Sequence, residues 1–157
     1  MDSFAKHPYI FLRKDGYYID IPKNITTLAE GSFIGANITT VIVPDNITTI
    51  GKGAFLGSAV SNVILPERLT DIADDAFTAC LNLRKIYLPA SLTTLGARTF
   101  MGCQNLECIT IPENVQKVGD EAFAFCRNLQ KVTLPEQKIH FGENVFYGCP
   151  RNWSSDQ

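Results

Sequence analysis

The sequence predicts a solenoid, a fold in which short coils of similar length stack on one another. Two observations support this prediction: six prolines recur at intervals of 22 or 23 residues, and six phenylalanines keep the same intervals, each 11 residues after its proline. Two columns that stay in phase along most of a chain indicate a tandem array. The prolines are Pro22, Pro44, Pro66, Pro89, Pro112 and Pro135, and the phenylalanines are Phe33, Phe55, Phe77, Phe100, Phe123 and Phe146.

A short stretch of alternating apolar and β-branched residues precedes each proline, as in Val41-Ile42-Val43 and Val132-Thr133-Leu134. A period of two residues with β-branched side chains predicts a strand of about four residues. We expect six such strands, one per repeat, to stack in a parallel ladder at a spacing of about 4.8 Å. Because proline has no amide hydrogen to donate, it ends each strand.

Between the proline and the phenylalanine, an aliphatic pair such as Leu69 and Ile72 precedes a column of small residues. Alanine resists a positive φ, so a column that mixes alanine with glycine predicts close packing or a bend and no obligatory left-handed backbone. Phenylalanine rings that repeat at one strand spacing would stack with their centroids about 4.5 to 7 Å apart. The small column consists of Ala29, Gly51, Ala73, Gly96, Gly119 and Gly142.

The segment after the phenylalanine reads Phe-x-x-Cys-x-Asn-Leu in three repeats, for example from Phe100 to Leu106. Residues three apart share one side of a helical turn, so we expect a single short helical turn that is stabilised by packing on the neighbouring coil. The first two repeats are one residue shorter and have Ala36 and Ser58 at the cysteine position. The last repeat departs from the pattern, with Lys138 where an aliphatic residue is expected.

These columns resemble the BspA-like class of leucine-rich repeats. The segment from Ile109 to Leu129, Ile-Thr-Ile-Pro-Glu-Asn-Val-Gln-Lys-Val-Gly-Asp-Glu-Ala-Phe-Ala-Phe-Cys-Arg-Asn-Leu, follows that family's unit of aliphatic-x-aliphatic-Pro, an Ile-Gly pair and Ala-Phe-x-x-Cys. The resemblance implies a right-handed leucine-rich-repeat solenoid with a strand-lined face, roles in protein or host-surface binding, and no catalytic residues. We therefore expect an N-terminal lead-in or cap over residues 1–17, an array of about six repeats over 18–149 and a C-terminal tail over 150–157.

Four cysteines form a further column, for which a metal site, a disulfide framework and packed thiols are alternatives. No two cysteines have the Cys-x-x-Cys spacing of zinc sites. Parallel side chains would hold neighbouring Cβ atoms about 4.8 Å apart, beyond the usual ~3.8 Å of a disulfide. We favour buried free thiols that pack as small hydrophobic groups. Cys108 lies outside the column, on an outward strand position, and is the strongest candidate for a reactive thiol. The column consists of Cys80, Cys103, Cys126 and Cys149.

Catalytic motifs are scarce. His7 and His140 lie in neither a His-Glu-x-x-His nor a Gly-x-Ser-x-Gly motif, and the sequence contains no Walker-type glycine loop. Acidic residues that follow the strand prolines are candidates for a cation or acid-base site, but Ala90 interrupts their column and solvated turn residues are the simpler interpretation. We expect no enzyme activity, no metal and no cofactor. The acidic residues are Asp45, Glu67, Glu113 and Glu136.

Charge and hydropathy argue against two classes of partner. Fourteen basic and sixteen acidic residues give a formal net charge of −2, which provides no large positive field for phosphate backbones or anionic lipid. The apolar runs are shorter than the roughly 18 residues of a membrane-spanning helix, and the start of the chain lacks a signal-peptide core. We expect neither nucleic acid nor a membrane as partner. A complete chain would be cytoplasmic, whereas a fragment of a typical family member would belong to a surface or secreted protein.

We expect function on the outward face of the strands, because core packing does not fix the residues there. Ile42, Ile64 and Tyr87 form an apolar stripe beside Asn62 and Lys85, a composition typical of a modest interaction patch. The alternative is that β-branched and aromatic residues there merely suit strands. The two outward columns are Tyr18, Thr40, Asn62, Lys85, Cys108 and Lys131, and Asp20, Ile42, Ile64, Tyr87, Thr110 and Thr133.

The sequence therefore predicts a noncatalytic protein-binding module that uses this face. A surface adhesin that binds a host matrix protein or a glycan is the alternative, suggested by the resemblance and by Tyr18, Asn62 and Tyr87. At the ends of the array, apolar side chains such as Phe4 are expected to cover the first coil. Weak cover by Trp153 at the other end predicts a monomer or weak end-to-end self-association.

Overall fold

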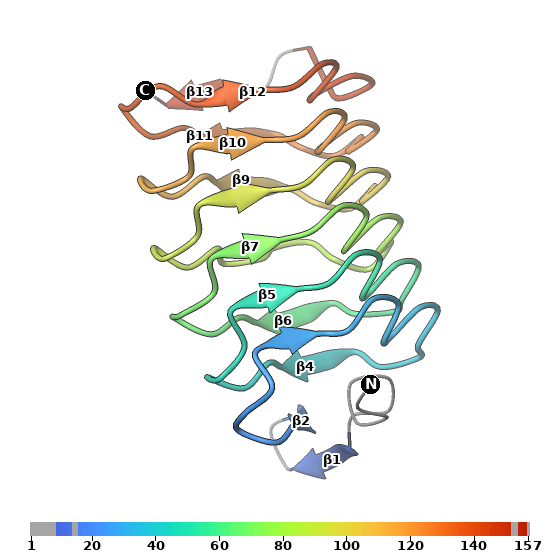
Figure 1. The fold of residues 1–157 in the computed structure, drawn as a ribbon. Helices are drawn as coiled ribbons and strands as arrows, with labels where there is room; N and C mark the ends of the chain where they lie inside the picture. The colour runs from blue at the N-terminus through green and yellow to red at the C-terminus, as the bar shows by residue number, and fades with distance from the viewer. Residues whose placement is uncertain (1–8, 14–15, 152–153, 157) are drawn as a thin grey trace.

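The computed structural model describes residues 9–13, 16–151 and 154–156, which form a parallel β-solenoid whose coils stack along one axis (Figure 1). The strands are short, because each coil has corners close together. They are β1 (Tyr9–Arg13), β2 (Gly16–Asp20), β3 (Thr27–Leu28), β4 (Thr40–Ile42), β5 (Thr49–Ile50), β6 (Asn62–Ile64), β7 (Asp71–Ile72), β8 (Thr94–Leu95), β9 (Cys108–Thr110), β10 (Lys117–Val118), β11 (Lys131–Thr133), β12 (His140–Phe141) and β13 (Ser154–Asp156).

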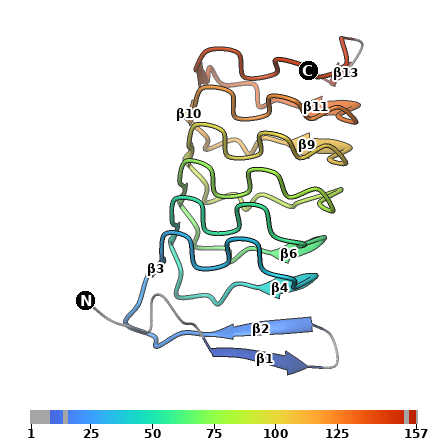
Figure 2. The same ribbon diagram turned by 90° about the vertical axis from the view of Figure 1, so that its right-hand side faces the viewer.

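Two sides of the solenoid are lined by strands. On one side lie a four-stranded sheet in the order β1-β2-β4-β6 and a three-stranded sheet in the order β13-β11-β9. On the other side lies a six-stranded sheet in the order β12-β10-β8-β7-β5-β3 (Figure 2). The pairing of β1 with β2 is antiparallel, and the remaining pairings are parallel. We call the side formed by β2, β4, β6, residues 85–88, β9 and β11 the strand face.

The strand face confirms the alternating pattern read from the sequence. Val41, Val63, Ile109 and Val132 lie in the middle of their strands and are buried, whereas the residues on either side of them point outward. Thr40 pairs with Asn62 and Ile42 with Ile64, so equivalent residues of successive repeats do form columns. Further along, Lys131 pairs with Cys108 and Thr133 with Thr110.

The first strand of the face is out of the expected register. The sequence columns place Tyr18 beside Thr40, but in the structure Tyr17 pairs with Val41 and Tyr18 with Ile42. Tyr18 therefore belongs to the column of Ile42, Ile64 and Tyr87, a correction of two residues. The reason is that β2 is also one arm of the hairpin with β1, and the pairing of Tyr9 with Asp20 and Arg13 with Gly16 constrains its position.

The predicted ladder of six strands is interrupted. Residues 85–88 form no strand, so the four-stranded sheet ends at β6 and the three-stranded sheet begins at β9. The interruption falls where the repeat length changes, since the interval from Pro66 to Pro89 is the first of 23 residues. The extra residue lies in the turn before residue 85 and changes the approach of this segment to the shorter coil beneath it. At the C-terminal end, β13 in the expected tail adds a strand to β11.

The segment around each phenylalanine is a pair of β-turns and not the expected helical turn, and the described residues contain no helix. In the third repeat, the amide of Ala76 donates to Ala73 (3.4 Å) and that of Cys80 to Phe77 (3.3 Å), with positive φ at Asp75 and Ala79. A positive φ at the third position is typical of a type II turn. A helix cannot form because the amides of Phe77 and Ala79 donate instead to the next coil, to Thr99 and Met101.

The core confirms the phenylalanine ladder. Phe33, Phe55, Phe77, Phe100, Phe123 and Phe146 stack in sequence, with centroid distances of 5.1, 5.1, 5.3, 5.3 and 5.6 Å and interplanar angles of 5 to 11°. These distances lie in the favourable range for offset aromatic pairs. Neighbouring coils therefore share one continuous apolar interior, as a repeat that cannot bury its own apolar side requires.

The small column packs closely, as predicted. A Cβ atom at Gly96 would lie 2.5 Å from the amide nitrogen of Asp74 in the preceding coil, and one at Gly119 would lie 2.6 Å from the carbonyl carbon of Gly96. Neither glycine has a positive φ, so the requirement here is space between coils. This contact also draws the backbone of the six-stranded sheet together.

Candidate protein-binding face

The strand face presents most of the predicted binding residues to solvent. Asn62, Ile64, Lys85, Tyr87, Thr110 and Lys131 are exposed, and Thr40, Ile42, Cys108 and Thr133 are half-buried. Tyr87 has 77% of its side chain exposed and Ile64 has 49%. The backbone of Tyr18 lies in β2, and its side chain is outside the described part. The structure thus brings the apolar stripe of Ile42, Ile64 and Tyr87 to one surface.

The main chain of residues 85–88 forms no cross-coil hydrogen bonds. At the equivalent position two coils earlier, the amide of Val43 donates to the carbonyl of Ile64 (3.0 Å), and one coil later the amide of Ile111 donates to Thr133 (2.9 Å). Among the described residues, no backbone hydrogen bond involves Lys85, Ile86, Tyr87 or Leu88. The strand face therefore carries unpaired main-chain groups in its middle.

A groove lies beside this unpaired segment. It has a volume of about 520 Å³, and we call it the Tyr87 groove. Cys108 and Thr110 of β9 line it together with the unpaired segment, and the turn after Pro112 forms one end. It combines apolar and polar groups in a volume within the range of small binding sites, about 300 to 1,000 Å³. The lining residues are 85–88, 90, 108–110 and 112–114.

Charged side chains flank this groove at both ends. Lys85 and Glu113 are exposed and belong to the lining. Just before the unpaired segment, Arg84 and Glu107 approach to 3.7 Å with 74% and 41% of their side chains exposed, so this ion pair adds little to stability. The electrostatic character of the groove is therefore set by one cation and one anion at opposite ends.

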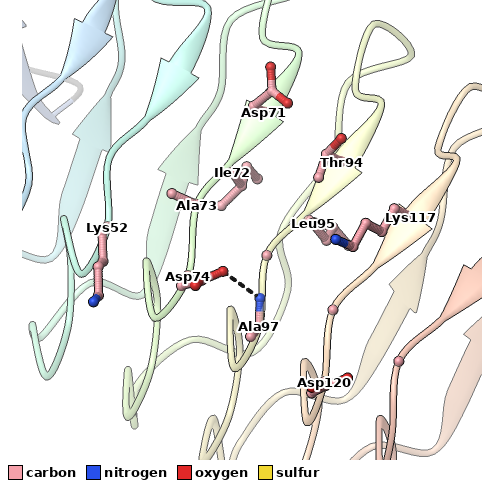
Figure 3. Close-up of a pocket in the computed structure, with 13 residues that line it drawn as sticks. Lys52, Asp71, Ile72, Ala73, Asp74, Thr94, Leu95, Ala97, Lys117 and Asp120 are labelled. Atoms are coloured by element: carbon pink, nitrogen blue, oxygen red, sulfur yellow. Dashed lines mark hydrogen bonds between the residues drawn. The ribbon is translucent and has the colours of Figure 1, made fainter.

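A second groove of about 520 Å³ lies over the six-stranded sheet (Figure 3). Its floor is the small column at Ala73, Gly96, Gly119 and Gly142, where short side chains leave a trough. The carboxylate of Asp74 accepts a hydrogen bond from the amide of Ala97 (2.8 Å). That of Asp120 accepts one from Glu143 (2.8 Å). These two carboxylates therefore already help to hold successive coils together.

The cysteine column is a set of internal hydrogen-bond donors. The Sγ atoms of Cys80, Cys103, Cys126 and Cys149 donate to the carbonyls of Phe55, Phe77, Phe100 and Phe123 at 3.0 to 3.2 Å. Burial raises the pKa of Cys80 to about 11, and burial also raises the pKa of Cys103. The pKa of Cys126 is raised by its hydrogen bond with Cys149 and by burial. The three buried thiols, Cys80, Cys103 and Cys126, pack as the sequence predicts.

The remaining candidates are scattered. His140 is exposed on β12, and His7, Phe4 and Trp153 lie outside the described residues. The acidic residues Asp45, Glu67, Glu113 and Glu136 are exposed, as solvated turn residues are. In the part of the chain that the structure describes, no three histidine, cysteine or acidic side chains gather closely enough to hold a metal ion. The same part contains no helix with the length and apolar character needed to cross a membrane.

Comparison with known proteins agrees with the repeat architecture. The profile described as "BspA type Leucine rich repeat region" matches in six copies, over residues 7–92 and 26–152. The chain belongs to the BspA-type leucine-rich repeat family. Members of this family are generally non-enzymatic repeat proteins that serve as interaction or surface modules. A search of curated proteins found no match.

Solved structures of bacterial repeat proteins share the fold of this BspA-type array. The leucine-rich repeat protein of T. pallidum superposes with a TM-score of 0.75 at 26% identity, covering 95% of this chain and 91% of that protein. A leucine-rich cell surface protein of Faecalibacterium prausnitzii gives a TM-score of 0.74 at 26% identity, covering 93% and 48%. The pneumococcal vaccine antigen PcpA shares the fold at 19% identity, with a TM-score of 0.66 and coverage of 95% and 41%. The chain thus spans less than half of the latter two.

Two features of the BspA-type array are absent from the sequence columns. The first is the second strand ladder, which the aliphatic-then-small pattern could have indicated, since Thr27-Leu28 and Thr49-Ile50 alternate in the same way in successive repeats. The second is the Tyr87 groove. The change in repeat length marks its place, but a repeat pattern does not reveal whether two coils remain hydrogen-bonded.

Proposed function

We propose that this chain is a noncatalytic protein-binding module and that its strand face holds the binding site. The observation that carries the proposal is the exposure of Tyr87 and Ile64 beside the Tyr87 groove. Exposed aromatic side chains next to a cavity are common anchors of protein interfaces, because they bury a large area at a small cost in side-chain entropy. The site residues are Tyr18, Thr40, Ile42, Asn62, Ile64, Lys85, Tyr87, Cys108, Thr110, Lys131 and Thr133.

The test is a double substitution on the strand face. Ile64→Asp with Tyr87→Asp should abolish capture of a purified protein partner while the circular dichroism spectrum and thermal midpoint stay close to those of the wild type. A matched control is Ile34→Asp with Leu81→Asp, because Ile34 and Leu81 are 60% and 48% exposed and lie in the turns, away from the strand face. Unchanged capture by the strand-face variant, or equal loss in the control, would reject the site.

A surface adhesin that binds a matrix protein or glycan is the second candidate. It is supported by the similarity to a leucine-rich cell surface protein of F. prausnitzii. Glycan arrays separate the two: selective glycan retention that depends on Tyr87 supports the adhesin, and retention of a protein partner alone supports the protein-binding module.

A further inference from the structure

We propose that the Tyr87 groove binds an extended peptide segment, whose main chain hydrogen-bonds to residues 85–88 and whose central apolar side chain packs on Tyr87. This proposal rests on the protein-binding function proposed above and specifies the chemistry of the partner. It is carried by three features of the groove: its main-chain lining, its exposed aromatic ring and the charges at its ends.

The floor of the groove is mainly backbone. Ile86, Leu88 and Ile109 line it, although their side chains are only 7%, 5% and 2% exposed. Because these side chains point into the core, the atoms that these residues present to the groove are mainly those of the main chain. Such a floor offers amide and carbonyl groups at regular intervals.

These main-chain groups need partners. The amide of Leu88 and the carbonyl of Tyr87 occupy positions at which the other coils make ladder bonds, such as Val43 to Ile64. Unpaired backbone groups at the surface are satisfied by water or by another chain, and an added strand satisfies several at once. An extended peptide presents donors and acceptors with the matching spacing, which is how peptides add to exposed strands in other recognition modes.

The aromatic ring supplies an anchor point. Tyr87 is the most exposed large apolar side chain of the described residues, and the structure shows no aromatic ring packed against it. Ile64 extends the apolar surface on the adjacent coil. An apolar side chain of a bound segment would remove this surface from water, at roughly 25 cal/mol for each Å².

The charges give the segment a direction. Lys85 begins the unpaired stretch, and Glu113 follows Pro112 at the opposite end of the groove. Among the described residues, neither side chain forms an ion pair. From residue 85 to residue 90 an extended chain spans about 17 Å, so the groove accommodates five or six residues. The complementary segment carries an acidic residue near Lys85, an apolar residue at Tyr87 and a basic residue near Glu113.

The experiment selects binders from a displayed library of random heptapeptides on the immobilised full chain. We expect enriched sequences with an apolar residue between an acidic and a basic one. For a synthetic peptide of the enriched sequence, Tyr87→Asp and Tyr87→Ala should each weaken binding at least about tenfold, as loss of a buried aromatic anchor does. Leu81→Asp, at a turn residue that is 48% exposed, should leave binding unchanged.

Two further measurements test the backbone and the charges. N-methylation of the peptide's central amides should weaken binding about tenfold if those amides donate to the groove. The double substitution Lys85→Glu with Glu113→Lys should reverse the preference, so that a peptide with exchanged terminal charges binds better. On binding, the amides of residues 85–88 should gain protection from hydrogen exchange.

Several outcomes would overturn the proposal. They are the absence of enriched peptides, binding that survives Tyr87→Asp, or binding that tolerates N-methylation. If a purified protein partner needs Ile64 and Tyr87 but no peptide binds, the groove takes a folded surface, and only the peptide proposal fails. If glycans are retained through Tyr87 and peptides are not, the peptide proposal fails in favour of the adhesin. If peptide and protein binding both ignore Ile64 and Tyr87, the strand face is not the site.

Discussion

The Sγ atom of Cys103 donates a hydrogen bond of 3.1 Å to the carbonyl oxygen of Phe77, which lies in the preceding coil. The same carbonyl accepts the amide of Cys80 at 3.3 Å, so one oxygen serves a turn within its own coil and a thiol from the next. This relationship repeats along the cysteine column and links the thiols to the stacked phenylalanines. The cysteines therefore contribute to stacking through a polar bond as well as by filling space.

The buried thiols predict a loss of stability at high pH. Burial raises the folded-state pKa of Cys80 from 9.0 to about 11, so between these values the unfolded thiol loses its proton while the folded one keeps it. The contribution is fully present below pH 9 and disappears as the pH rises toward 11, with a slope of about 1.4 kcal/mol per pH unit for one thiol. Guanidinium unfolding under reducing conditions at pH 8, 9 and 10 measures this slope.

Cys80→Ser is the control for that slope, because Ser58 occupies the equivalent position one repeat earlier. The variant should lose stability less steeply above pH 9 than the wild type. Equal slopes in the two proteins would mean that Cys80 does not titrate with folding.

Phe100→Ala should destabilise the array by about 3 to 5 kcal/mol, the usual cost of removing a fully buried phenylalanine. Phe100 stacks on Phe77 and Phe123 at 5.3 Å on each side, so the cavity would interrupt the ladder in its middle. Tyr87→Ala is the comparison, since a side chain that is 77% exposed should change stability by less than about 0.5 kcal/mol. Chemical denaturation of the two variants gives both values, and an unmoved midpoint for Phe100→Ala would contradict the ladder.

The periodic part of the fold could be predicted because the columns of side chains repeat a physical requirement. Phe100 and Cys103 are buried in every coil that has them, and their spacing alone indicates that the coils stack. The hydrogen bonding within a coil was harder to predict. Phe77 and Cys80 are three apart in either a helical turn or a β-turn, and the choice depends on the amide of Phe77 donating across the stack to Thr99.

Positive φ angles in these turns predict an unusual pair of effects. Ala79 has a φ of 57° at a position where Gly102 has 70° in the next coil. Glycine adopts this conformation without a steric penalty, whereas other residues are strained there. Ala79→Gly should therefore stabilise the array by about 1 kcal/mol, and Gly102→Ala should destabilise it by a similar amount.

A Cβ atom at Gly102 would find nothing closer than 3.9 Å, so the second substitution tests backbone strain without a clash. Thermal denaturation of the two single variants would reveal opposite shifts. Two shifts of the same sign would show that side-chain contacts, and not φ, dominate this column.

The site was only partly predictable for a related reason. Ile64 and Tyr87 fall on the outward face by the alternation of the strands, and the structure places both there. The groove beside them depends on whether two coils of unequal length stay hydrogen-bonded, which no side-chain column encodes. The corrected register of Tyr18 has the same origin, since it follows from main-chain pairing in a hairpin.

The interruption of the ladder predicts a local pattern of hydrogen exchange. The amides of Val43 and Ile111 donate to the next coil at 3.0 and 2.9 Å, whereas those of Leu65 and Leu88 have no backbone acceptor among the described residues. We therefore expect the amides of Leu65 and Leu88 to exchange at least about tenfold faster than those of Val43 and Ile111 under native conditions, because exchange there needs no opening of a hydrogen bond. The four leucine, valine and isoleucine side chains are all buried, so solvent exposure of the side chain does not explain a difference. Amide exchange followed by nuclear magnetic resonance resolves these sites individually. Equal protection at the four amides would mean that the strand face is a continuous ladder and that the Tyr87 groove has no unpaired floor.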